Sequence, residues 1–245
     1  MLNAFDSLEV EDRIIVALDC AADEALEIAL SLKGKARWMK VGMTLFYESG
    51  PSVIKALKEA GFKVFLDLKF YDIPHQVEGA AASATSHGVD MLTMHTSGGL
   101  AMMEAAQKGA IRAAHEAGFE VPATLGITVL TSMDDATLAQ IGVNNSMADQ
   151  VRLLAHNAQE AKISGVVASP QEASMLRELL GAEAYIVTPG VRPIGSEKGD
   201  QSRVATPAQA LSDGASHIVI GRPITQAANR VAAFDEIVKE IKNEC

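Results

Sequence analysis

Three charged residues close the most apolar run of the chain, in the stretch KVFLDLKFYDIPHQ (63–76). Asp67 and Lys69 alternate with apolar residues, and Asp72 follows three positions later. Two more charges, Asp19 and Lys40, stand in the apolar runs RIIVALD (13–19) and WMKVG (38–42). Salt pairing at strand ends explains any one such pair. Burial of a whole array costs roughly several kcal/mol per ion before pairing offsets it, so we interpret the array as a functional site.

The order of these charges suggests a particular chemistry. A lysine held between carboxylates keeps its proton, because neighbouring negative charge favours the ammonium form. Such a lysine is a poor Schiff-base nucleophile, but it can stabilise a developing carbanion and then protonate it. Fixed carboxylates would also repel an anionic group on the substrate. The combination suits loss of a carboxylate followed by protonation of the carbon left behind.

Short β-branched runs alternate with helical stretches along the 245 residues. The expected strands are 13–19, 38–42, 63–69, 91–96, 123–130, 165–169, 185–190 and 217–221, and helices are expected at 22–33, 52–61, 99–118 and 169–181, with Asp23 as a possible N-cap. Eight strand–helix units in a chain of this length predict a (β/α)₈ TIM barrel, an α/β fold, with residues 1–245 as a single domain. A doubly wound open sheet is the alternative, but the first turn, LDCAADEA, lacks its glycines.

Side-chain alternation along the strands predicts which residues face inward. Ile14, Val16 and Leu18 share one face of the first strand, and Ile15, Ala17 and Asp19 share the other. The same parity in the next two strands separates an apolar set, suited to the helix layer, from the charged set. We therefore expect the charged side chains to meet inside the barrel mouth: Asp19, Lys40, Asp67 and Lys69.

The end of the chain offers an anion site. Strand eight runs into IGRPIT (220–225), where Gly221 allows backbone N–H groups to approach an oxyanion and Arg222 can grip it. The loop after strand seven, TPGVRPIGSEKGDQSRVATP (188–207), carries Arg192 and Gln201 and is typical of an active-site lid. Loops after strands seven and eight are the usual phosphate site of such barrels.

Composition excludes several classes of partner. The formal net charge of −10 argues against nucleic acid and anionic membranes. The two cysteines, Cys20 and Cys245, and the absence of a signal-like start predict a reduced, cytoplasmic chain, with Cys20 a small buried filler. His75, His87 and His95 lie on different elements without a ligand motif, so we expect no metal site.

These blocks together resemble one known family. FLDLKFYDIP is similar to the Asp-x-Lys-x-x-Asp signature of the orotidine 5′-phosphate decarboxylases, and VALD, MKVG, GITVLTS, TPGVRP, GDQSR and IGRPI resemble its other blocks in the same order. The resemblance implies a homodimeric barrel that converts orotidine 5′-monophosphate to uridine 5′-monophosphate and CO₂ in de novo pyrimidine biosynthesis, without cofactor or metal.

The resemblance also implies roles for single residues. Lys69 would be the proton donor, and Lys40, Asp67 and Asp72 would complete the charged network, with Asp72 shared across the dimer interface. The implied substrate-binding set comprises Asp19, Lys40, Asp67, Lys69, Asp72, Ile73, Gln76, Thr131, Arg192, Gln201, Gly221 and Arg222. The chain departs from the family pattern at His75 and Gln76, where Asn-Thr is usual, and at Tyr71, where histidine is usual.

Two other functions compete with this interpretation. Sugar-phosphate enzymes on the same barrel, such as 3-keto-gulonate-6-phosphate decarboxylase or hexulose-phosphate synthase, share Asp-x-Lys-x-x-Asp but use Mg²⁺. TPGVRP and GDQ favour the nucleotide enzyme. A barrel that only binds a nucleotide is the non-enzymatic alternative, and the intact charge array argues against it.

Overall fold

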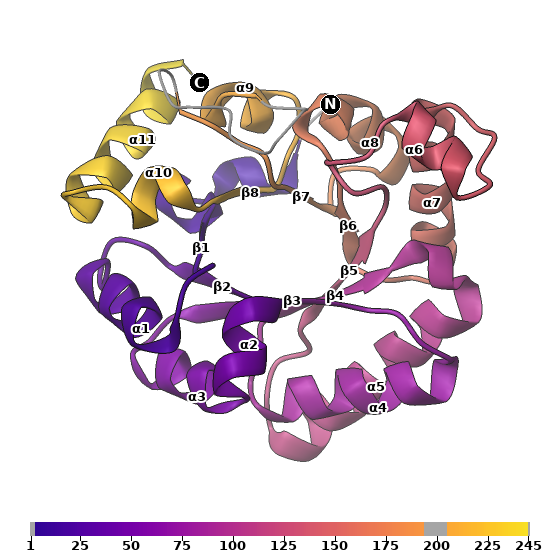
Figure 1. The fold of residues 1–245 in the computed structure, drawn as a ribbon, viewed down its shortest axis with the longest axis horizontal. Helices are drawn as coiled ribbons and strands as arrows, with labels where there is room; N and C mark the ends of the chain where they lie inside the picture. The colour runs from indigo at the N-terminus through magenta and orange to yellow at the C-terminus, as the bar shows by residue number, and fades with distance from the viewer. Residues whose placement is uncertain (1–2, 194–204, 245) are drawn as a thin grey trace.

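Eight parallel strands close into a barrel in the computed structural model, which describes residues 3–193 and 205–244. The strands are β1 (Ile14–Ala17), β2 (Trp38–Gly42), β3 (Lys63–Phe70), β4 (Met91–His95), β5 (Ala123–Ile127), β6 (Gly165–Val167), β7 (Tyr185–Thr188) and β8 (His217–Ile220). Each strand pairs with the next in sequence, and β8 closes the ring against β1. Figure 1 shows the strands as a central ring inside the helices. The predicted single (β/α)₈ barrel is confirmed.

Helices connect each strand to the next, and others precede β1 or follow β8. They are η1 (Ala4–Ser7), η2 (Val10–Arg13), α1 (Ala22–Ser31), α2 (Met43–Ser49), α3 (Ser52–Glu59), α4 (Pro74–Ser86), η3 (Thr96–Gly98), α5 (Leu100–Ala117), α6 (Asp135–Gln140), α7 (Met147–Glu160), η4 (Pro170–Glu172), α8 (Ala173–Leu180), α9 (Pro207–Ser212), α10 (Arg222–Thr225) and α11 (Arg230–Glu244). In the described parts of the chain, none of them combines the length and apolar character needed to cross a bilayer.

Helix boundaries follow local chemistry, with one correction. Gly61 ends the turn after α3 at a φ of +95°, a conformation that glycine adopts without steric cost. Asp23 is not the N-cap of α1: the cap is Ala21, and Asp23 lies in the first turn. A carboxylate there still favours the positive end of the helix dipole, so the residue type was informative although the position was wrong.

Strand parity divides the apolar core into two clusters. Ile14, Val16 and Leu18 pack with the helices in the larger cluster. Ile15 and Ala17 belong to a smaller cluster inside the barrel, with Trp38, Phe65, Met91, Leu125, Val187 and Val219. The predicted alternation is therefore confirmed.

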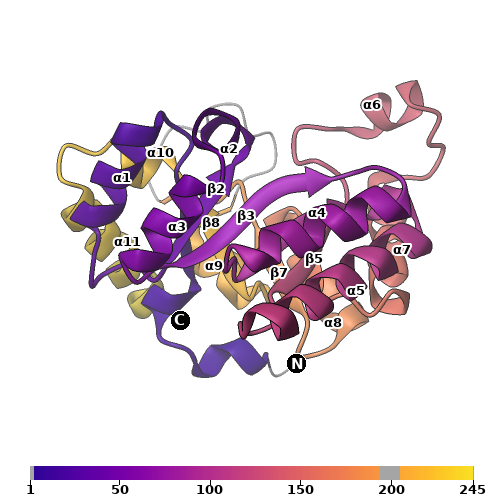
Figure 2. The same cartoon turned by 90° about the horizontal axis from the view of Figure 1, so that it is seen from below.

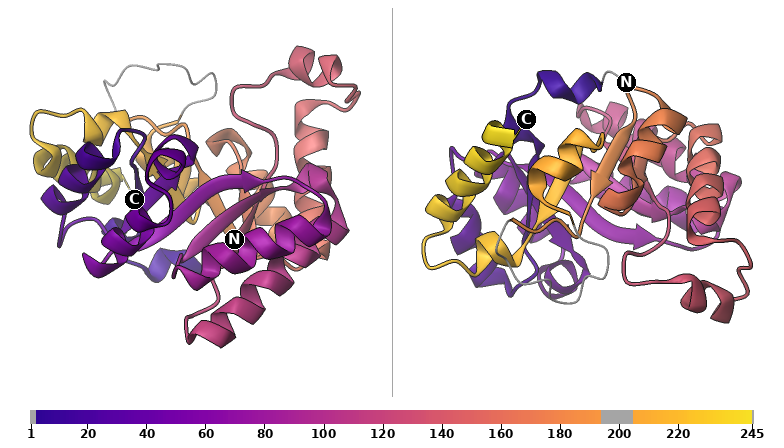
Figure 3. Two further views of the ribbon diagram at one scale, coloured as in Figure 1. Left: turned by 60° about the horizontal axis from the view of Figure 1, so that its bottom comes forward. Right: turned by 90° about the horizontal axis from the view of Figure 1, so that it is seen from above.

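The two ends of the barrel differ in shape. The segment that carries α6 projects beyond the rest of the molecule on the side where the β3 arrow ends (Figures 2 and 3). The amino-terminal end is closed by an aromatic floor, which consists of Phe5, Trp38, Tyr185 and His217. The phenyl ring of Phe5 lies edge-on to Tyr185, with ring centroids 4.7 Å apart. These packed rings fill the amino-terminal end of the barrel, whereas the cavity described below lies at the carboxyl-terminal end.

Candidate active site

A cavity of about 680 Å³ opens at the carboxyl ends of the strands. Its size suits a ligand as large as a nucleotide. The residues of the sequence-predicted site that line it are Asp19, Lys40, Asp67, Lys69, Thr131, Arg192, Gly221 and Arg222. The structure therefore brings together the charged set from the first three strands and the anion-binding set from the end of the chain.

Four charged side chains form a continuous series of ion pairs in the cavity wall. Lys40 Nζ lies 2.8 Å from Asp19 Oδ1 and 3.8 Å from Asp67 Oδ2. Lys69 Nζ lies 2.8 Å from the same Asp67 oxygen. Positive and negative groups alternate along this series of ion pairs, as the strand parity predicted. Asp67 is its centre, because its carboxylate contacts both ammonium groups.

The charged side chains differ in their exposure to water. The Asp19 side chain is 63% exposed, whereas those of Lys40 and Asp67 are 9% and 14% exposed. Burial by itself would raise the pKa of Asp67, but Lys40, Lys69 and the hydrogen bonds from Lys69 and Thr93 together hold it below its usual value. Asp67 is therefore ionised at neutral pH and is the negative pole of the site.

A break in the β3–β4 ladder shapes this centre. Leu66 pairs with Leu92 and Phe70 with Met94, so residues 67–69 lie opposite Thr93 alone. Lys69 adopts a φ of +54°, which is uncommon for a residue with a side chain. Such irregularities redirect side chains and gather at functional sites. Here the bulge carries both members of the Asp67–Lys69 pair.

Sequence reasoning missed two residues that complete this site. Thr93 is fully buried and hydrogen-bonds both Asp67 and the Lys69 backbone. Thr93 lies two residues after Met91 on β4, so strand alternation would have placed its side chain inside the barrel with that of Met91. Gly42 lines the cavity, and a Cβ there would lie 3.0 Å from both Asp19 Oδ1 and Lys40 Nζ. A side chain at this position would therefore press on the ion pair.

The residues predicted to bind an anion line the same cavity, beside β1. Gly221 follows the last residue of β8, and α10 begins at Arg222, which is exposed and lines the cavity. Arg192 lines the same wall, and its backbone N–H donates to the carbonyl of Ala205 at 2.9 Å. Gln201, predicted to act with them, lies outside the described residues. Thr131 lines the cavity after β5.

Three predicted substrate-binding residues do not line this cavity. Asp72, Ile73 and Gln76 are exposed at the start of α4. Asp72 Oδ1 accepts a hydrogen bond from the backbone of Ile73 at 2.6 Å. Within one chain, Asp72 therefore does not complete the charged network, and a role in catalysis would require a second copy.

Tyr71 and His75, two of the positions at which the chain differs from the family pattern, lie next to these residues. Tyr71 is 62% exposed, and its ring lies against His95 with centroids 5.3 Å apart. Burial, and then Lys69, lowers the pKa of His95, which keeps this imidazole neutral beside the site. His75 is exposed on α4. Across residues 3–193 and 205–244, no three His, Cys, Asp or Glu side chains cluster as a metal site would require.

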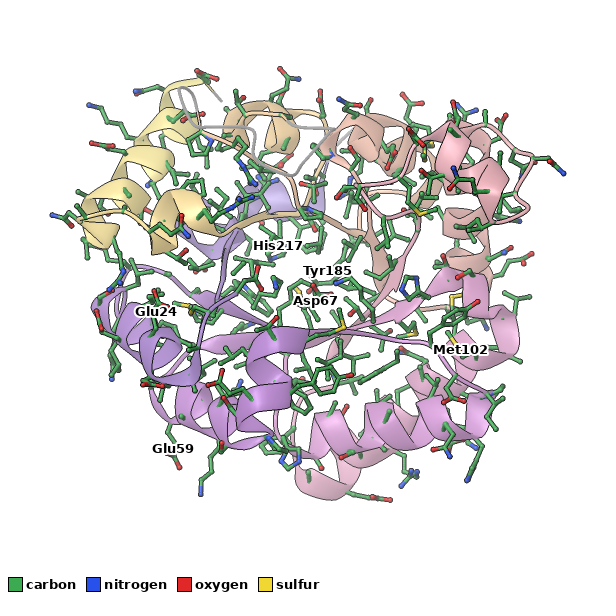
Figure 4. The ribbon with its side chains drawn as sticks, viewed as in Figure 1. Glu24, Glu59, Asp67, Met102, Tyr185 and His217 are labelled. Carbon is green, nitrogen blue, oxygen red and sulfur yellow. The ribbon has the colours of Figure 1, made fainter. Side chains whose placement is uncertain are left out.

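Cys20 differs from the filler that the sequence suggested. It is partly exposed and lines the cavity next to Asp19. Burial, followed by the charges of Glu24 and Asp19, raises the pKa of its thiol to about 11. Figure 4 shows Asp67 near the centre of the ring of strands, whereas Glu24 belongs to α1, in the helix layer outside that ring.

Comparisons with known proteins agree with this geometry. Residues 12–237 match the model of the orotidine 5′-phosphate decarboxylase / HUMPS family. Orotidine 5′-phosphate decarboxylase of Mannheimia succiniciproducens is 46% identical over 96% of this chain and 99% of its own length. The Moorella thermoacetica protein of the same name is 47% identical, over 96% of this chain and 94% of its own. A crystal structure of orotidine 5′-phosphate decarboxylase from Lactobacillus acidophilus superposes with a TM-score of 0.83 at 39% identity, covering 94% and 99% of the two chains.

Proposed function

This chain belongs to the orotidine 5′-phosphate decarboxylase / HUMPS family, and we propose from its site how it converts orotidine 5′-monophosphate to uridine 5′-monophosphate and CO₂. It is a carboxy-lyase of pyrimidine biosynthesis. The observation that carries the mechanism is the Lys69–Asp67 ion pair, 2.8 Å long, in the wall of a cavity large enough for a nucleotide.

The reaction breaks the bond between C6 of the pyrimidine and its carboxylate. The bonding electron pair stays on C6, and CO₂ leaves. The Lys69 ammonium stabilises this developing carbanion and then gives it a proton, which forms the new C6–H bond and leaves a neutral amine that solvent reprotonates. Asp67 orients the ammonium through their ion pair, and Lys40 contacts the same Asp67 oxygen and favours the ionised form of that carboxylate.

The phosphate would bind in the same cavity at the end of β8, next to β1. Arg222 and the backbone at Gly221 are the predicted ligands, with Arg192 beside them. Binding energy gained at this distant group can be used to hold the pyrimidine against the charged network. We assign the ribose hydroxyls to the Asp19–Lys40 pair; the exposed Asp19 carboxylate at the end of the network supports this assignment.

A second copy of the chain would supply Asp72. Tyr71 and Ile73 flank it and are 62% and 63% exposed, so an apolar surface surrounds this carboxylate. In the homodimer that we propose, Asp72 and the larger Gln76 reach the partner's cavity. Mixing inactive Asp72→Asn and Lys69→Ala chains should restore part of the activity, since hybrid dimers contain one intact site. Mixtures as inactive as either variant would count against the shared site.

The decisive assay uses the purified chain and orotidine 5′-monophosphate in chelator-treated buffer. We expect the ultraviolet absorbance of the substrate to fall, with uridine 5′-monophosphate and CO₂ appearing in equal amounts. Activity that disappears with EDTA and returns with Mg²⁺ would favour the sugar-phosphate branch of the family. A chain that forms no uridine 5′-monophosphate would overturn the proposal. The predicted cytoplasmic location is tested separately, by fractionation of cells.

A further inference from the structure

The side chain of Thr93 sits between the two central residues of the charged network. Its hydroxyl Oγ1 lies 2.9 Å from the backbone nitrogen of Lys69 and 3.0 Å from Asp67 Oδ1. The residue is fully buried on β4, so water does not compete for these bonds. The opposite carboxylate oxygen, Asp67 Oδ2, is the one that contacts Lys69 and Lys40.

The direction of each hydrogen bond follows from the groups present. A backbone N–H can only donate, so the hydroxyl oxygen accepts from Lys69. The single hydroxyl proton is then free to point at Asp67, which accepts it as a carboxylate. Thr93 thus favours the ionised form of Asp67 and leaves its second oxygen to the two ammonium groups.

The same contact supports the irregular backbone. Residues 67–69 of β3 face Thr93 alone, so the Lys69 N–H has lost the carbonyl partner that a regular ladder would provide. Lys69 also holds a φ of +54°, a strained conformation for a residue with a side chain, which persists only where its surroundings fix it. The Thr93 hydroxyl supplies the missing acceptor at this residue.

We propose that Thr93 is a positioning residue for the decarboxylation: its hydroxyl fixes the Asp67 carboxylate and the Lys69 backbone so that the ammonium points into the cavity. The proposal rests on the proposed function, because Lys69 acts there as the proton donor. Thr93 itself is absent from the cavity lining and acts through these two residues.

A graded series of substitutions tests the hydroxyl. Thr93→Ser keeps both hydrogen bonds and should retain wild-type kcat within about threefold. Thr93→Val keeps the shape but leaves two buried groups unbonded, and kcat should fall roughly 10- to 100-fold with KM changed far less. Thr93→Cys, a weak donor and acceptor, should fall between them. If the valine variant does not fold, the serine–cysteine pair carries the test.

The pH profile separates positioning from simple loss of stability. Without the hydroxyl, Asp67 protonates more readily, so the acid limb of kcat/KM should move to higher pH in Thr93→Val and stay in place in Thr93→Ser. Ionisation of the substrate phosphate is common to every variant and cancels in this comparison. The proposal would be overturned if Thr93→Val left both kcat and the acid limb of kcat/KM unchanged. It would also be overturned if Thr93→Ser lost as much kcat as Thr93→Val.

A failure of the proposed function gives a different result. In that case the wild-type chain itself would not convert orotidine 5′-monophosphate, and the series would have no activity to compare. An active wild type whose valine variant matches it in kcat and pH profile would instead reject Thr93 alone.

Discussion

At the mouth of the barrel Asp67 is buried and ionised, whereas at the floor His217 is buried and neutral. Two cations surround Asp67 and lower its pKa although burial acts in the opposite direction. At the floor, burial lowers the pKa of His217 to about 3, and the nearby cations Arg13 and Lys63 add to the shift. Neighbouring cations thus stabilise the negative charge of Asp67 and disfavour a positive charge on His217, although both side chains lie inside the barrel.

The two regions also satisfy their cations differently. At the mouth, Lys40 and Lys69 contact carboxylates. At the floor, the guanidinium of Arg177 donates to the carbonyls of Gly181, Ala182, Ala184 and Gly214. Arg13 donates to the carbonyls of Ala215 and Ser216 and, from its more exposed end, to the Asp6 carboxylate at 3.1 Å. Carbonyl partners lock a cation into the fold, whereas a lysine that ends in a cavity stays available to a substrate. The comparison therefore predicts that mouth variants lose activity and floor variants lose stability.

The largest expected effect is that of Lys69→Ala. Removing the proton donor and its charge should lower kcat by about 10⁴-fold or more, while the chain stays folded, because Lys40 still contacts the Asp67 carboxylate that loses one partner. Stopped assays over hours measure the residual rate. Lys55→Ala, at an exposed position on α3, is the matched control. An alanine variant that keeps wild-type turnover would remove Lys69 from the mechanism.

Two arginines allow a matched test of mouth against floor. Arg222→Gln removes a predicted phosphate ligand and should raise KM roughly 10- to 100-fold with little change in unfolding free energy. Arg177→Gln leaves buried carbonyls unbonded and should lower the unfolding free energy by about 2–4 kcal/mol with kcat nearly unchanged. Urea unfolding and steady-state kinetics on both variants decide. The opposite pattern would break the division between the two regions.

His217 predicts a pH dependence of stability. Its pKa is about 3 in the folded chain and roughly 6.5 when unfolded, so between these values the unfolded state binds more protons and stability falls as pH falls. From pH 7 to pH 5.5 the wild type should lose about 1 kcal/mol more than His217→Phe, which keeps an aromatic ring against Tyr185. Urea titrations at the two pH values measure this difference. Equal slopes would show that the imidazole is not buried in its neutral form.

Alternation along single strands predicted much of the molecule from the sequence. Because side chains of a parallel strand alternate strictly, the sequence placed Asp19, Lys40 and Asp67 on the inner face, and the structure places them there. The mouth could be predicted because its charges stand out in apolar strands. The floor could not, since Phe5 and His217 come from opposite ends of the chain and look like ordinary core residues.

The remaining gaps have local physical causes. Thr93 acts through a bulge, and neither the register shift nor the positive φ of Lys69 has a glycine or proline to announce it. Gly42 matters through the space it leaves, which becomes visible only when Asp19 and Lys40 are placed. The role proposed for Asp72 would need a second copy of the chain, and no single-chain pattern shows where such a copy would lie.

The smallest effect is expected at Cys20. This residue lies at the mouth, but burial keeps its side chain uncharged, as it does for His217 at the floor. No cation dominates its surroundings, so burial raises the pKa of the thiol to about 11 and keeps it protonated. In a Cys245→Ser background, alkylation by iodoacetamide at pH 8 should be about 100-fold slower than for a thiol of pKa 9, and should quicken about tenfold per pH unit up to about pH 11. Uridine 5′-monophosphate should slow it further, because Cys20 lines the cavity. A rate that levels off near pH 8 would mean that Lys40 or Arg230 stabilises the thiolate, and the contrast between mouth and floor would then extend to this residue.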